Sequence, residues 1–217
     1  MSPSIATLAK ATRVGLSAAR TTEIQRRARA DHKGMSVAVC AALGHEDDAI
    51  DIGAHEGTFM RQMVECAPGG RHLAVEPLPR HATTLRDTMP SNVIVEEYAV
   101  TDAHEPVEMD FLHVLNNTGY SGLRERDYPE APRFQRLKVE AISLDTLVQR
   151  HGLRPRLIRV DVEGAELLVL EGARRTIAEH RPWLMVEHGS AAAGYGETSS
   201  TFYDLACDLD LRIYDFD

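Results

Sequence analysis

The run A-I-D-I-G-A-H-E-G at residues 49–57 constrains this chain most, because an apolar strand ends there at an acid and a glycine turn follows. An amphipathic helix is predicted directly after the turn, over residues 58–66. A second apolar strand then ends at another acid, Glu76, about 20 residues further on, which is the interval that one β-α-β unit needs. The pattern therefore predicts a parallel sheet with the turn and both acids at the carboxyl ends of its strands.

The turn also indicates what such a unit would bind. Gly53 and Gly57 let the backbone approach a ligand, and Glu76 can accept hydrogen bonds from two ribose hydroxyls. A dinucleotide fold needs G-x-G-x-x-G, but His55 stands at the second glycine position, and no glycine stands three residues beyond it. Asp51 would repel phosphate but could hold a cationic or amino group, so the charges favour S-adenosylmethionine. The alternative is a β-α-β unit with a tight turn and no ligand.

Composition narrows the class of protein. The chain has 217 residues, of which 43% are hydrophobic, and this suits one well-packed domain. A formal net charge of -9 disfavours nucleic acid as a partner. Cys40, Cys66 and Cys207 form an odd set without C-x-x-C, which predicts a reduced, cytoplasmic protein. We expect no membrane span and no signal peptide, because the chain lacks both a long apolar run and an apolar N-terminal core.

Strand and helix patterns alternate along most of the chain. We expect strands over residues 49–52, 72–76, 93–98, 157–160, 183–187 and 211–216, and extended segments over 107–113 and 137–142. We expect helices over residues 35–44, 58–66, 79–89, 144–151, 165–180 and 198–209. This alternation predicts an α/β fold with a doubly wound, mainly parallel, Rossmann-like sheet.

The first part of the chain differs in composition from the rest. We expect a basic, N-terminal helical extension over residues 1–44 and the α/β domain over residues 45–217. The extension packs on the domain as a solvated arm, or else it forms a homodimer contact or a lid over the substrate.

A second distinctive run is L-I-R-V-D-V-E-G-A-E at residues 157–166, continued by L-E-G-A at 170–173. Shorter matching segments are D-I-G-A-H-E-G at 51–57, V-E-P at 75–77, A-V-T-D at 99–102, I-S-L-D at 142–145 and M-V-E-H at 185–188. Together they resemble the FkbM family of S-adenosylmethionine-dependent methyltransferases over about residues 49–216.

This resemblance implies a class I methyltransferase fold and O-methylation of a hydroxyl on a sugar, glycan or glycosylated natural product. It also implies a C-terminal hairpin, of which only the first strand is expected here, so we expect either that the sequence is cut short or that the closing strand is missing. The rival hypotheses are an N- or protein methyltransferase of the same fold and a non-catalytic, cofactor-binding scaffold. No sequence feature excludes the first rival, whereas the intact acids argue against the second.

The cofactor site is expected to draw on the turn and on the ends of the next two strands. The methionine half would contact Asp51, Gly53, Ala54, His55, Glu56 and Gly57, the ribose would contact Glu76, and the adenine would contact Tyr98 and Ala99. For the acceptor we expect His113 and the polar segment at residues 116–122, whose amides, hydroxyls and aromatic ring suit a sugar.

Catalysis is expected where two further strands end. Asp161 is at the end of one expected strand, and Glu187 and His188 are at the end of the next, so all three should face the transferred methyl group. His188 could act as general base. Alternatively the three could hold a divalent cation, and magnesium suits them better than zinc because no cysteine pair is available. A third alternative is positioning alone. Glu163 and Glu166 are equally well explained by a helix N-terminus.

Overall fold

The computed structural model describes residues 34–125, 128, 131–187, 194–196 and 198–214. Residues 34–42 are helical, and residues 39–214 form one compact unit. Most of the expected extension at residues 1–44 lies outside the described residues. The arm, the homodimer contact and the lid therefore stay predictions.

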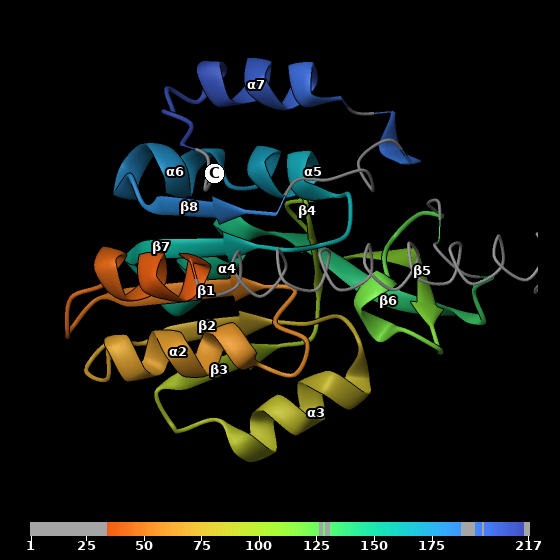
Figure 1. Ribbon diagram of the computed structural model, residues 1–217, viewed down its shortest axis with the longest axis horizontal. Coiled ribbons are helices and arrows are strands. Elements are labelled where there is room, and N and C mark those ends of the chain that lie inside the picture. The colour runs from red at the N-terminus through yellow and green to blue at the C-terminus, as the bar shows by residue number, and fades with distance from the viewer. Residues whose placement is uncertain (1–33, 126–127, 129–130, 188–193, 197, 215–217) are drawn as a thin grey trace, which may run out of the picture. The chain divides into compact units, whose positions relative to one another are not determined.

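A five-stranded parallel sheet organises this unit (Figure 1). Its spatial order is β3 (Val93–Glu96), β2 (His72–Val75), β1 (Asp48–Ile52), β7 (Pro155–Val160) and β8 (Trp183–Val186). Every neighbouring pair is parallel. The connections reverse direction between β1 and β7, and open sheets bind ligands at the carboxyl ends of strands beside such a switch point. The predicted doubly wound α/β fold is confirmed.

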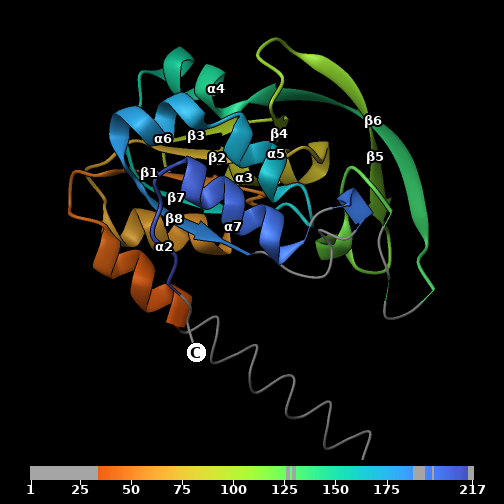
Figure 2. The same cartoon turned by 90° about the horizontal axis from the view of Figure 1, so that it is seen from above.

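Helices cover both faces of this sheet, with α2 and α4 on opposite sides of it (Figure 2). The helices are α2 (Thr58–Cys66), α3 (Pro79–Thr88), α4 (Leu144–His151), α5 (Glu166–Glu171), α6 (Arg174–His180) and α7 (Ser199–Asp208). The main core joins apolar residues of the central strands, such as Ile50 and Ile158, to Leu147 of α4 and Ile177 of α6. Ser143 caps α4 by accepting the N–H of Thr146.

A second, three-stranded sheet has the order β4 (Ala99–Thr101), β6 (Phe134–Ser143) and β5 (Val107–Val114). The pair β5–β6 is antiparallel and extends as a curved ribbon beyond the parallel sheet (Figure 2). The single strand expected over residues 93–98 is wrong at its end. The chain leaves the parallel sheet after Glu96 and enters the second sheet at Ala99, because Ala99 packs in a separate small core with Phe111 and Ala141.

The single helix expected over residues 165–180 is also wrong, because α5 and α6 are separate. Gly172 lies between them, and a Cβ atom there would stand 1.9 Å from the backbone oxygen of Thr101. The Asp145 carboxylate then accepts the backbone N–H groups of Arg175 and Thr176 at 3.0 and 2.7 Å. The close approach of Gly172 to Thr101 and the new helix start at α6 explain the break. Neither can be seen in the apolar pattern of residues 165–180.

The sixth strand expected over residues 211–216 does not form over residues 211–214, and residues 215–216 lie outside the described part. The backbone N–H of Leu211 bonds the carbonyl of Ala206, at the end of α7. Ile213 and Tyr214 are 50% and 69% exposed, so these apolar side chains find no sheet face to cover. The apolar pattern predicted a strand that the backbone bonds do not make.

Cys40 and Cys66 form a disulfide that links the helix at residues 34–42 to the end of α2, with a Cα–Cα distance of 5.2 Å. The expectation that all cysteines are unpaired is therefore wrong, and the sequence spacing could not show the proximity. Cys207 is free and exposed. The cytoplasmic location stays a prediction, and the disulfide weighs against it. In the described part of the chain, no helix is both long and apolar enough to span a membrane.

Candidate functional site

The glycine turn after β1 is shaped by the packing of the protein itself. Gly53 and Gly57 have φ values of 78° and 80°, a region that favours glycine. A Cβ atom on Gly53 would stand 1.8 Å from the backbone oxygen of Asp161, and one on Gly57 would stand 2.2 Å from the Met89 side chain. From the sequence these glycines were assigned to the ligand alone, whereas the structure gives them a structural requirement as well.

Glu76 lies directly after β2, where the sequence predicts a ribose-binding acid. It is 4% exposed, and its two oxygens accept the backbone N–H groups of His55 and Leu78, both at 2.9 Å. Burial raises the pKa of Glu76 to about 7. Each carboxylate oxygen can accept a further hydrogen bond, so the side chain fits two vicinal hydroxyls of a ribose.

A buried arginine, Arg159 of β7, connects the acids at this edge. Its guanidinium bonds Asp51 at 2.9 Å and Asp161 at 2.5 Å, and it lies 4.1 Å from the centroid of the Phe59 ring. Burial raises the pKa of Asp51, and the charge of Arg159 opposes that rise. From the sequence, Asp51 was expected to attract a ligand cation, and this internal cation was missed. The signal for it was a charged residue between apolar ones in a buried strand.

The predicted catalytic acids Asp161 and Glu187 do come together, because β7 and β8 are neighbours in the sheet. The Arg159 guanidinium lies 3.9 Å from the Glu187 carboxylate. Burial raises the pKa of Glu187, and the nearby charge of Asp161 raises it further. His188 lies outside the described residues, so the three-residue metal site and the histidine base stay predictions.

The remaining predicted residues have varied surroundings. Ala99 is buried in β4 opposite Ala141, and the Arg150 guanidinium lies 5.5 Å from the Tyr98 ring centroid. The contact of Tyr98 and Ala99 with adenine stays a prediction. Glu166 is 1% exposed and accepts the N–H of Gly164 at 2.9 Å, which supports its interpretation as part of a helix start.

A cavity of about 550 Å³ adjoins the turn, between the starts of α2 and α3 and the second sheet. Among its lining residues are Thr58, Arg61, Arg80, His81, His113 and Thr118. Of these, His113 and Thr118 belong to the predicted acceptor segment. Thr118, in the short 3-10 helix η1 (Thr118–Tyr120), bonds Nε2 of His55 at 2.7 Å. His81 was missed from the sequence, although it follows closely after Glu76.

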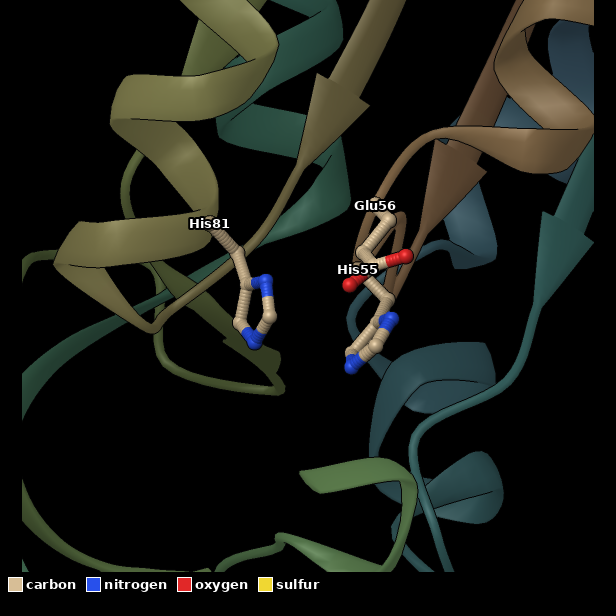
Figure 3. A group of neighbouring side chains, drawn as sticks. All are labelled: His55, Glu56 and His81. Atoms are coloured by element: carbon tan, nitrogen blue, oxygen red, sulfur yellow. The ribbon is translucent and has the colours of Figure 1, made fainter. Parts of the chain in front are cut away.

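The position of His81 opposite the turn is shown in Figure 3, where its ring faces His55. The two ring centroids are 4.2 Å apart. Burial lowers the pKa of His81, and so does the neighbouring His55. The cavity wall thus contains neutral imidazole and threonine hydroxyls, next to two arginines.

The sheet order, the glycine turn after β1 and the acid after β2 together define a class I S-adenosylmethionine-dependent methyltransferase. The description "Methyltransferase FkbM domain" belongs to a family profile that matches residues 51–208. The chain therefore belongs to the FkbM methyltransferase family, as the sequence motifs predicted.

One similar solved structure is the precorrin-6y C5,15-methyltransferase of Geobacter metallireducens GS-15, with 14% identity and a TM-score of 0.44. The match covers 80% of this chain and 70% of that one. Among curated proteins, no match was found.

Proposed function

We propose that this enzyme methylates a hydroxyl on a sugar, glycan or glycosylated natural product. The observation that supports this proposal best is the pair of carboxylates, Asp161 and Glu187, beside the glycine turn. A hydroxyl must lose its proton as it is methylated, and a carboxylate of raised pKa is a suitable acceptor.

The residues at the turn fit the methyl donor. Bound S-adenosylmethionine supplies an electrophilic methyl group on a positively charged sulfur. Glu76 is held by two backbone N–H groups in a position suited to the ribose. The acids around Arg159 outnumber its single positive charge, so this edge attracts a cation.

Glu187 is the base in this proposal. It accepts the proton that the acceptor hydroxyl releases, while Asp161 raises its basicity and remains paired to Arg159. In this proposal the proton transfer to Glu187 runs without a metal ion. Magnesium held by Asp161, Glu187 and His188 stays the alternative, and activity that survives exhaustive EDTA treatment would exclude it.

The cavity supports a hydroxyl-rich, small-molecule or glycan acceptor. The hydroxyls of Thr58, Thr84 and Thr118 can form hydrogen bonds with sugar hydroxyls, and Thr84 does so as an acceptor because its O–H donates to the carbonyl of Arg80. A methylation screen over sugars, glycosides, amines and peptides with labelled donor tests this. Methyl ethers as products support the proposal, whereas products methylated only on nitrogen would overturn it.

The base itself is tested by Glu187→Gln and Asp161→Asn. We expect turnover to fall about a hundredfold in each, because both remove help with the proton. Affinity for S-adenosylhomocysteine should change less than about threefold, since neither residue is placed on the adenosine. Steady-state kinetics and calorimetry on the same samples give both numbers.

Glu179→Gln is the matched control, because Glu179 is an exposed glutamate on α6, away from the turn. It should leave turnover unchanged. Near wild-type turnover in Glu187→Gln would show that another group accepts the proton.

A further inference from the structure

Three side chains beside the cavity offer a donor set that the proposed proton transfer to Glu187 does not use. They are His55 and Glu56 of the turn and His81 of the first turn of α3 (Figure 3). One ligand atom from each lies within 4.8 Å of those of the other two. His81 is buried, whereas Glu56 is exposed, so the group is closed on one side and open on the other.

The geometry of His55 shows that the fold fixes this ring in place. Its φ of 49° lies in a region that residues other than glycine rarely adopt. The Thr118 hydroxyl bonds Nε2 of the ring at 2.7 Å and so fixes its orientation. Histidines that bind metals are commonly oriented in this way by a second hydrogen bond.

The spacing is close to what an ion requires. A tetrahedral metal ion holds nitrogen and oxygen ligands at about 2.0–2.2 Å, which places two ligand atoms roughly 3.3–3.6 Å apart. The three ligand atoms lie within 4.8 Å of one another, and side-chain rotations would bring them to that separation. The adjoining cavity leaves room for water or an acceptor oxygen at the remaining coordination positions.

We propose that His55, Glu56 and His81 form a binding site for a divalent transition-metal ion of the zinc class. Two imidazoles and one carboxylate suit such ions, whereas magnesium prefers oxygen ligands alone. This site is separate from the strand ends at Asp161 and Glu187. The ion would stand at the wall of the acceptor cavity, where it could bind an acceptor oxygen.

The test titrates untagged protein with zinc chloride in a calorimeter, without the methyl donor. We expect saturable binding of one ion per chain, and no competition from millimolar magnesium. Glu56→Gln should weaken binding at least tenfold, and this exposed position does not threaten folding. His81→Ala should weaken it further. His45→Ala is the control, because His45 is an exposed histidine outside the group, and it should bind like wild type.

Cobalt absorption identifies the ligands. Bands of a nitrogen- and oxygen-ligated ion that disappear in His81→Ala support the site. Sulfur charge-transfer bands that disappear in Cys207→Ser would assign the ion to the free thiol and overturn the proposal. So would the absence of saturable binding, or wild-type affinity in both Glu56→Gln and His81→Ala. Because no methyl transfer is measured, these outcomes are independent of the proposed reaction.

Discussion

The two sheets use charged residues in opposite ways. In the parallel sheet, Asp51 and Arg159 are buried and bonded to each other, so their positions are fixed. In the second sheet, Arg136 and Lys138 of β6 are more than half exposed and pair with acids in solvent. The difference teaches that the buried charges of the parallel sheet are held in a fixed geometry, whereas the exposed side chains of β6 can change at little cost in stability.

Replacement of one arginine by methionine in each sheet should give the largest difference in stability between the two sheets. Arg159→Met leaves Asp51 buried without its guanidinium, which should cost about 3–5 kcal/mol of the free energy of unfolding. Arg136→Met removes an exposed ion pair with Glu125, which should cost less than about 1 kcal/mol. Urea unfolding of both variants measures the two values. Equal losses would show that the buried cluster does not hold the parallel sheet together.

Glycine substitutions sharpen the contrast at the level of the backbone. Gly53→Ala forces a Cβ atom against the Asp161 backbone at positive φ, and we expect a loss of about 4 kcal/mol. Gly152 has a φ of 61°, but a Cβ atom added there would meet nothing within 4 Å. Gly152→Ala should therefore lower the free energy of unfolding by only about 1–2 kcal/mol. Chemical denaturation compares them. Similar losses would mean that positive φ alone, and not the close approach, sets the requirement for glycine.

Reduction of the Cys40–Cys66 disulfide tests how much this bond beside the parallel sheet contributes to the free energy of unfolding. The bond joins residues separated by 26 positions, and a loop of that length predicts about 3.5 kcal/mol of stabilisation. Cys66→Ser should therefore lower the unfolding free energy by about that amount, as should dithiothreitol. Cys207→Ser is the control and should have no effect, since that cysteine is free and exposed. If dithiothreitol left the unfolding free energy of the wild type unchanged, the result would contradict the disulfide.

The smallest expected change in the free energy of unfolding comes from Glu76, and it is confined to a defined pH range. Its pKa is raised from 4.5 to about 7, so between these values the folded state binds a proton that the unfolded state has lost. Stability contributed by this group therefore falls as the pH rises from about 4.5 to 7, by on the order of 2 kcal/mol. In Glu76→Gln this fall should disappear. Urea unfolding at pH 5 and pH 8 in both proteins isolates the difference.

The same variant tests the ribose assignment. Glu76→Gln should bind S-adenosylhomocysteine at least tenfold more weakly by calorimetry, because an ionised acceptor is replaced by a neutral one. Unchanged affinity would remove Glu76 from the cofactor site.

The parallel sheet could be predicted from the sequence because local pattern and tertiary burial agree there. Apolar strands such as 157–160 are buried on both faces, and the acids follow them in order. The extended segments of the second sheet could be predicted as well, but their pairing could not, because the chain changes sheets between Glu96 and Ala99. The break at Gly172 depends on the backbone of Thr101, about 70 positions away in the chain. Local patterns contain no record of such distant contacts.

The same limit applies to the candidate site. Asp161 and Glu187 were predicted to converge because strand ends in one sheet must do so. Arg159 and His81 were missed, because their partners come from other elements. Side chains that act through neighbours distant in sequence are visible only once the fold brings them together.

The surplus of carboxylates around Arg159 has a consequence for the order of events in a catalytic cycle. Asp51, Asp161 and Glu187 share one guanidinium, so this edge favours a cation over a neutral molecule of the same shape. The methyl donor is cationic at sulfur, whereas the demethylated product is not. With the methyl donor placed at this edge as proposed, the chemistry itself weakens the binding of the demethylated product. Exchange of the product for a new donor molecule then has a favourable free energy. Added salt should reduce this preference for the donor, because it screens the charges.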